Sequence, residues 1–177
     1  EGRATPDLFP VARAVAAKGG FLNDIVIYPD VLIDRDFIAA NVSRDYENGI
    51  RIGGAKLTID GSPQGFTALR DRPYYDPVGS HPPGYAGYAS ATMDQVINAF
   101  DWAFQNNIQI LTHANGEGAS DMMLAAVRNA SEKHGEADRR PVLLSTHGAP
   151  DRGPDGLRLR TCEGIALGLP MGEDLRT

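Results

Sequence analysis

Lys56 is the residue whose type and position most suggest chemistry. It lies in the segment Gly53-Gly-Ala-Lys-Leu-Thr-Ile-Asp-Gly61, which predicts a short buried strand that opens into a polar turn. Because side chains alternate across a strand, Leu57 and Ile59 face one side of it and Lys56 faces the other. A lysine is rarely buried without a partner or a function. Lys56 therefore either faces water at a sheet edge or supplies its amine for chemistry.

His113 is the second candidate because it is the last residue of a predicted buried strand, Ile108-Gln-Ile-Leu-Thr-His113. The segment Ala114-Asn-Gly-Glu-Gly118 then turns the chain toward a helix. A lone histidine is more often structural than a ligand. In (β/α)8 barrels, however, the active site is built at the C-terminal ends of the strands, which is where His113 would lie.

Elements that could position these two residues alternate along the chain. A helix predicted over 6–18 ends at Gly19-Gly20, and its apolar residues indicate that it covers a sheet. Thr92 is the predicted N-cap of the clearest helix, 92–106. Strands alternating with helices favour parallel βα units and an α/β fold. After residue 19 the predicted elements are strand 23–29, helix 31–41, the Lys56 strand, loop 66–90, helix 92–106, strand 108–113, helix 119–133 and a strand ending at Leu144.

Composition limits the kinds of partner. The 177 residues are 42% hydrophobic with a net charge of −6, which is typical of a soluble chain with a core. No run of basic residues could bind along a phosphate backbone, so we expect no nucleic acid partner. No apolar run is long enough for a membrane helix. The single cysteine, Cys162, excludes an internal disulfide framework and suits a reducing compartment. We expect a cytoplasmic protein that could form homo-oligomers.

The segment Lys56 to Gly65 resembles a motif of amidohydrolase family 3, the YtcJ-like metal-dependent hydrolases of the amidohydrolase superfamily. That motif reads Lys-x-x-x-Asp-Gly-Ser-x-Gln-Gly. In the superfamily a lysine on this strand can react with carbon dioxide, and the resulting carbamate, a hard oxygen ligand, bridges two metal ions. The resemblance implies that Lys56 belongs to a metal site, that Asp60 supports it, and that Gln64 contacts substrate.

The segment His113 to Asp121 resembles the second motif of this family, His-Ala-x-Gly-Asp-x-Ala-x-Asp, in which the histidine binds metal. Glu117 stands where the family has its first aspartate, so the charge is retained. The resemblance implies that His113 is a metal ligand and that Asn115 and Glu117 hold the histidine in position without binding the metal themselves. It extends over roughly residues 20 to 144, and it implies a partial (β/α)8 barrel, about strands 3 to 6, over residues 1–144.

The loop 66–90 combines many prolines and glycines with four tyrosines, and a loop this long is usually functional. In the family the corresponding loop helps to form the wall of the substrate pocket. Tyr74, Tyr75 and Tyr85 are therefore candidate substrate contacts, because a tyrosine has an apolar ring with a polar tip. The alternative is that they attach a long loop to the fold. His81 is expected to be a solvated loop residue.

The activity implied by the resemblance is hydrolysis of an amide or cyclic amide bond in a small molecule by water activated on a divalent metal, zinc with one or two ions. The family also requires a His-x-His pair, which this chain lacks. We therefore expect an internal fragment of an enzyme, inactive alone. A non-catalytic half-barrel that binds a ligand or partner, or a pseudo-enzyme, is the alternative.

The chain changes character after Leu144. The family has a histidine at the end of its sixth strand, where this chain has Ser145, and His147 follows two residues later as a displaced candidate metal ligand. Residues 145–177 show no sustained apolar periodicity, which predicts an irregular, disordered tail. A disordered linker is the usual explanation, and we favour a frameshift in the encoding DNA.

Overall fold

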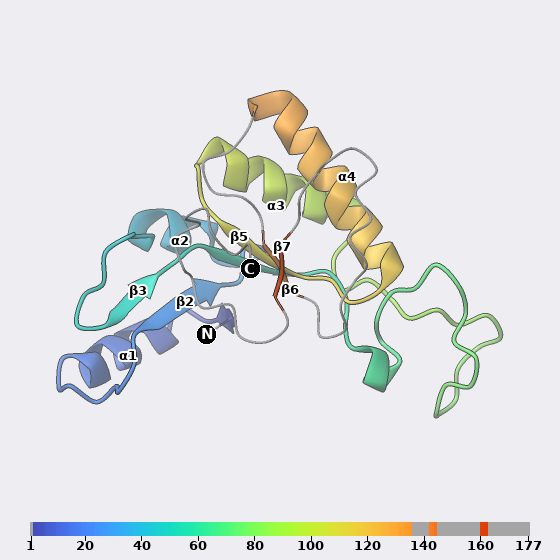
Figure 1. The fold of residues 1–177 in the computed structure, drawn as a ribbon, viewed down its shortest axis with the longest axis horizontal. Helices are drawn as coiled ribbons and strands as arrows, with labels where there is room; N and C mark the ends of the chain where they lie inside the picture. The colour runs from blue at the N-terminus through green and yellow to red at the C-terminus, as the bar shows by residue number, and fades with distance from the viewer. Residues whose placement is uncertain (1, 136–141, 145–159, 163–177) are drawn as a thin grey trace, which may run out of the picture.

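The structure is a computed structural model that describes residues 2–135, 142–144 and 160–162. Parallel strands and helices alternate along the chain, which confirms the predicted α/β class (Figure 1). The helices are α1 (Leu8–Ala16), α2 (Arg35–Asn41), α3 (Met93–Gln105) and α4 (Glu117–His134), with a 3-10 turn η1 (Pro63–Gly65). The strands are β1 (Gly2–Ala4), β2 (Ile25–Pro29), β3 (Ile50–Ile52), β4 (Ala55–Thr58), β5 (Ile110–His113), β6 (Val142–Leu144) and β7 (Arg160–Cys162).

The strands form two parallel groups, ordered β1-β2-β3 and β4-β5-β6-β7. A parallel bridge between Asp30 and Lys56 joins them, because the chain leaves β2 alongside β4. Gly53 and Gly54 separate β3 from β4. A Cβ on Gly54 would lie 2.2 Å from the backbone oxygen of Gln109, so glycine permits this close approach of the two chain segments.

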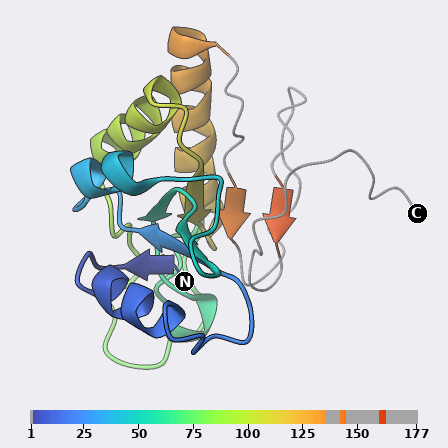
Figure 2. The same cartoon turned by 90° about the vertical axis from the view of Figure 1, so that its left-hand side faces the viewer.

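One face of β4 and β5 is covered by α3 and α4, which lie side by side (Figures 1 and 2). Leu57 and Ile59 are fully buried there against Phe100 and Met123. Thr92 caps α3 as predicted: its hydroxyl accepts the Gln95 amide, and the Gln95 side chain accepts the Thr92 amide. This packing fixes β4 and β5 and directs their opposite faces away from the two helices.

The apolar side of α1 differs from the expectation. The helix does lie against the β1-β2-β3 sheet, but it buries Ala12 and Ala16 there, whereas Leu8, Val11 and Val15 are exposed. Small side chains permit a close approach of helix and sheet, and Phe9 fixes the flank by an edge contact with Phe37. Of the apolar residues that indicate this helix in the sequence, Ala16 is buried against the sheet, and the larger Leu8, Val11 and Val15 are not.

Several features were not predicted. β1 and β3 are strands of three residues each, and α2 begins four residues later than expected, at Arg35. In the segment between β2 and α2, the Asp30 carboxylate accepts the backbone amide of Leu32. None of the helices in the described part of the chain is both long and apolar enough to cross a membrane.

The predicted irregular tail, 145–177, contains β7, which pairs in parallel with β6. The remainder of that tail lies outside the described residues. Its disorder and the frameshift remain predictions.

Candidate metal-site region at the ends of strands β4 and β5

Strands β4 and β5 place Lys56 and His113 on one face of the sheet. The register pairs Lys56 with Leu111 and Thr58 with His113, and paired residues of parallel strands share a face. Lys56 is therefore two residues nearer the start of its strand, about 6.6 Å along it at 3.3 Å per residue. His113 is the last residue of β5, as predicted, whereas Lys56 lies deeper in β4.

The Lys56 amine is buried and unsatisfied. The residue is 6% exposed, and Nζ has no hydrogen-bond partner among the described residues. The pKa of this amine is lowered from 10.5 to about 8, mainly by burial and also by the nearby positive charge of Arg3, while Asp30 opposes the change. Of the two sequence-based alternatives, the solvated lysine at a sheet edge is therefore wrong for this structure.

Arg3 and Asp30 form the charged surroundings of Lys56. Arg3 Nε donates to Asp30 Oδ2 at 3.1 Å, and the Asp30 carboxylate is itself nearly buried. The Lys56 side chain passes close to Gly2 of β1, since a Cβ on Gly2 would lie 3.6 Å from Lys56 Cδ and Cε. Sequence reasoning missed Arg3 and Asp30. Asp30 could have been found, because it directly follows strand β2.

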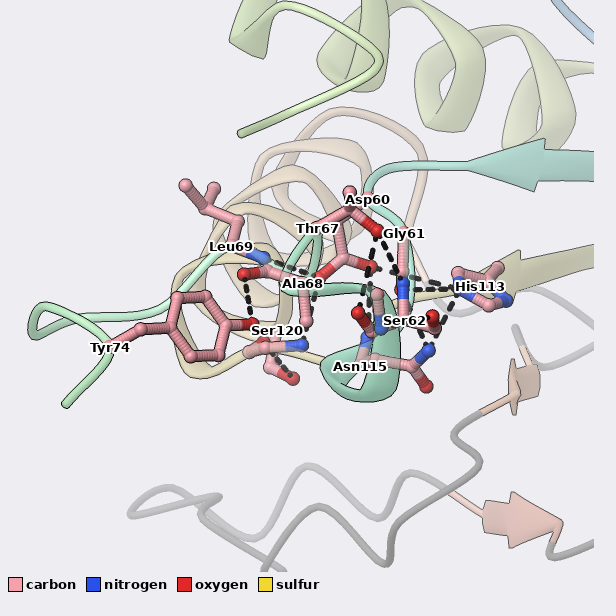
Figure 3. A network of polar contacts seen from close by, with 12 residues as sticks. Asp60, Gly61, Ser62, Thr67, Ala68, Leu69, Tyr74, His113, Asn115 and Ser120 are labelled. Carbon is pink, nitrogen blue, oxygen red and sulfur yellow. Dashed lines mark hydrogen bonds and ion pairs between the residues drawn. The ribbon is translucent and has the colours of Figure 1, made fainter. Parts of the chain in front are cut away.

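Asp60 is the centre of the polar network just beyond β4 (Figure 3). Its side chain is 0% exposed and accepts three backbone amides. Oδ1 accepts Asn115 N at 2.9 Å, and Oδ2 accepts Leu69 N at 2.9 Å and Gly116 N at 2.8 Å. Asp60 thus joins the loop after β4 to the turn after β5, the turn that follows His113.

The His113 ring is held by that same turn (Figure 3). Nε2 lies 2.9 Å from the carbonyl oxygen of Gly61 and 3.9 Å from Asp60 Oδ1. Asn115 Nδ2 lies 2.8 Å from the Gly61 oxygen and 2.9 Å from His113 Nε2. The structure therefore brings together three of the predicted residues, Asp60, His113 and Asn115, and adds the Gly61 carbonyl, which was not predicted.

Glu117 lies in the first turn of α4 and faces the loop instead of the His113 ring. Its Oε2 is 3.5 Å from Arg70 Nε, and both side chains are about one-third exposed. The Arg70 guanidinium in turn lies over the Tyr74 ring at 5.2 Å. The ion-pair partner of Glu117 is thus Arg70, and its predicted role of holding His113 remains a prediction.

The candidate substrate residues divide into two groups. Tyr74 and Tyr85 are stacked at 6.1 Å, and the Tyr74 hydroxyl donates to the Ala68 oxygen, which favours the alternative that they attach the loop to the fold. Burial raises the pKa of the Tyr74 phenol. Tyr75 is fully exposed, and Gln64, in η1, is also exposed. His81 is exposed, as expected, and stacks on Tyr85.

The described residues include two of the predicted metal ligands, Lys56 and His113. A buried amine without a partner and an anchored histidine on the same sheet face are suitable donors, but within residues 2–135, 142–144 and 160–162 no group of three His, Cys, Asp or Glu side chains could hold an ion. His147 lies outside the described residues. A complete ligand set therefore requires donors beyond those the structure describes.

Comparison with known proteins places this arrangement in context. A family model described as "Amidohydrolase family" matches residues 2–159. A search of curated proteins found no match. An uncharacterized metal-dependent hydrolase from Pyrococcus horikoshii OT3 is similar in structure, with a TM-score of 0.60 and 19% identity over 77% of this chain and 26% of that one. One from Pyrococcus furiosus has a TM-score of 0.59 and 21% identity over 81% of this chain. The chain thus spans 26% and 28% of the lengths of these structures.

Proposed function

Because this chain belongs to the amidohydrolase family, we propose that it is a segment of a metal-dependent hydrolase that cleaves the C–N bond of an amide or cyclic amide. Its parallel strands, with helices on one side, would form part of a (β/α)8 barrel. The observation that supports the proposal most is the anchored His113 at the end of β5, on the same sheet face as the buried, unpartnered Lys56. The C-terminal ends of the strands, where His113 lies, are where such barrels build their active sites.

His113 would contribute one nitrogen to a divalent ion, which the resemblance suggests is zinc, and Lys56 would contribute an oxygen after reaction with carbon dioxide. In that reaction the neutral Nζ attacks the carbon of CO₂, an N–C bond forms, and one proton passes from Nζ to water, which leaves a carbamate anion. Burial and the charge of Arg3 favour the neutral amine, because both lower its pKa to about 8. When bound, a metal ion of this kind supplies an acidified water that can attack a carbonyl carbon.

The chain's other residues would bind and orient. Asp60 and the Gly61 carbonyl hold His113, and Arg70 holds Glu117 at the first turn of α4. Tyr75 and Gln64 are the candidate substrate contacts at exposed positions, and the fully exposed Tyr75 could contact a small molecule. Tyr74 and Tyr85 would shape the loop that carries Tyr75.

Metal binding tests the proposal directly. Zn²⁺ should bind to the purified chain by calorimetry, and His113→Ala should weaken the binding at least tenfold. His134→Ala is the matched control, because His134 pairs with Asp101 on the surface between α3 and α4. Equal affinities of the wild type and His113→Ala would refute the metal assignment.

Two further assays address the finer claims. With ¹³C-bicarbonate, a carbamate resonance should appear in the wild type and be absent from Lys56→Met, while Lys18→Met, at an exposed position, should retain it. The chain alone with Zn²⁺ should not hydrolyse N-acyl or cyclic amides, because its described residues hold an incomplete ligand set. Efficient turnover by the chain alone would contradict the fragment interpretation.

The second candidate function is a non-catalytic half-barrel or pseudo-enzyme that binds a small molecule. One observation favours it: the part of the chain that the structure describes contains no three-residue metal cluster. Retention of a small amide ligand with no dependence on Zn²⁺ or on His113 would select this function over the hydrolase.

A further inference from the structure

The Asp60 carboxylate is placed to hold structure and cannot act as a base. Its side chain is fully buried, and its two oxygens accept three backbone amides from two separate segments. A catalytic base must reach a substrate proton within hydrogen-bond distance, which this carboxylate cannot do while it is enclosed by the protein. Its effect must therefore pass through the residues that it fixes.

The residue next to Asp60 is the one that contacts His113. The Gly61 carbonyl oxygen is within 2.9 Å of His113 Nε2 and 2.8 Å of Asn115 Nδ2. Asn115 Nδ2 lies 2.9 Å from the same ring nitrogen, but its amide already donates to the Gly61 oxygen. A carbonyl oxygen only accepts hydrogen bonds, so we assign the ring proton to Nε2, and the Asn115 amide then donates to Gly61 and not to the ring. In the neutral imidazole the other nitrogen, Nδ1, then carries the lone pair that a metal ion requires.

The Gly61 carbonyl has little freedom to move. Gly61 N donates to the Thr67 oxygen at 3.1 Å, and a Cβ on Gly61 would lie 2.0 Å from Thr67 Oγ1. On the opposite side, Asp60 attaches the turn after β5 through the amides of Asn115 and Gly116. The distance between the Gly61 oxygen and the His113 ring is thus set from both strands by one buried carboxylate.

We propose that Asp60 is a positioning residue: by fixing the Gly61 carbonyl against Nε2 of His113, it holds the ring in the tautomer that presents Nδ1 as the coordinating nitrogen. The proposal rests on the proposed function, in which His113 is a metal ligand. It also extends to the loop, because Asp60 accepts the amide of Leu69 and the Leu69 oxygen accepts the amide of Gly118. The loop that carries the candidate substrate residues is thereby fastened to the same turn.

The test compares Asp60→Asn with the wild type by nitrogen-detected NMR of the histidine rings, without metal. Asn at this position replaces an acceptor oxygen with an NH₂ group that faces backbone N–H donors, so at least one of the three hydrogen bonds is lost. In the wild type the His113 ring proton should be on Nε2 and should exchange slowly enough with water to be observed. In Asp60→Asn that resonance should be lost to exchange.

Asp101→Asn is the matched control, because it removes a carboxylate on α3 that pairs with Lys133 and His134 at the surface. The His113 signals should be unchanged in that variant. A wild-type ring protonated on Nδ1 would overturn the proposal, and so would a folded Asp60→Asn protein with an unchanged His113 resonance.

Two additional measurements keep the outcome decisive. If Asp60→Asn does not fold, the wild type still provides the test: the amides of Leu69, Asn115 and Gly116 must be protected from exchange, and rapid exchange of these three would overturn the proposal.

Zn²⁺ titration separates the proposal from the proposed function. Replacement of groups that orient a metal ligand typically lowers metal affinity 10–100-fold, and Asp60→Asn should show a loss of about that size. A wild type that binds no Zn²⁺ but keeps the slowly exchanging Nε2 proton would refute the metal site and leave the positioning role of Asp60 intact.

Discussion

Replacing Lys56 with methionine should stabilise this protein, although it removes a residue of the candidate site. Methionine is similar in length and needs no hydrogen bond, whereas the Lys56 amine is buried without a partner in the described structure. Burial lowers the pKa of this amine from 10.5 to about 8. A change of about 2.5 units at 1.36 kcal/mol per unit corresponds to roughly 3 kcal/mol of destabilisation at pH 7.

The pH dependence identifies the cause. Because the folded-state pKa of Lys56 is below the unfolded-state value, the unfolded chain binds more protons between about pH 8 and pH 10.5. The free energy of unfolding of the wild type should therefore increase relative to that of the variant as pH rises through this window. The advantage of Lys56→Met should fall from roughly 3 kcal/mol at pH 7 to about 1 kcal/mol at pH 10 by the same linkage.

Urea denaturation in buffers free of carbon dioxide, at pH 7, 8, 9 and 10, measures this difference. Exposed lysines such as Lys18 are common to both proteins, so their titration cancels. A difference in free energy of unfolding that is constant across the four pH values would refute the reasoning. It would mean that Lys56 is solvated, or already modified, in the folded protein.

The remaining predictions concern the turn after β5, the α3 cap and the tyrosine loop. Gly116→Ala should destabilise by about 1–3 kcal/mol, because its Cβ would lie 1.8 Å from the Leu69 oxygen; no change in the urea midpoint would contradict this. Thr92→Ala should cost about 0.5–2 kcal/mol through loss of the capping box, measured by urea denaturation. Tyr74→Phe should cost about 0.5–1.5 kcal/mol of stability and Tyr75→Phe nothing measurable in the same assay, because Tyr74 donates a hydrogen bond and Tyr75 is fully exposed; equal losses would contradict that distinction.

The sequence identified the longer elements because each carries a local pattern. Helix 92–106 has an apolar stripe and a threonine cap, and the structure has α3 over Met93–Gln105 with that cap. Alternation in the segment around Lys56 correctly placed its side chain opposite Leu57. Strands β1 and β3 were missed, because three residues are too few to show a period and their pairing with β2 is not local.

The environment of the candidate site was less predictable, because it depends on contacts between distant segments. Asp60 accepts amides from residues 55 and 56 positions later, and the Gly61 oxygen contacts a ring 52 positions later. Local patterns carry no information on such register. Resemblance to one family motif singled out Asp60, and resemblance to a second singled out His113, Asn115 and Glu117. The structure brings Asp60, His113 and Asn115 together, whereas Glu117 pairs with Arg70.

The two candidate metal residues differ in how the fold supports them, and this difference assigns them different roles. The His113 ring contacts Gly61, in the loop after β4, and Asn115, in the turn after β5, so its geometry is fixed by the protein itself. Lys56 has a buried amine with no partner among the described residues, so no hydrogen bond within that part of the chain fixes the position of Nζ. An unsatisfied buried amine costs free energy that hydrogen-bond or ligand formation would recover. Conversion of Lys56 to a carbamate would change a buried cation next to Arg3 into an anion next to Arg3, turning repulsion into attraction. Lys56 is therefore the unsatisfied residue of the two and His113 the anchored one. This is the arrangement expected if Lys56 is completed by modification and His113 is ready to bind a metal ion.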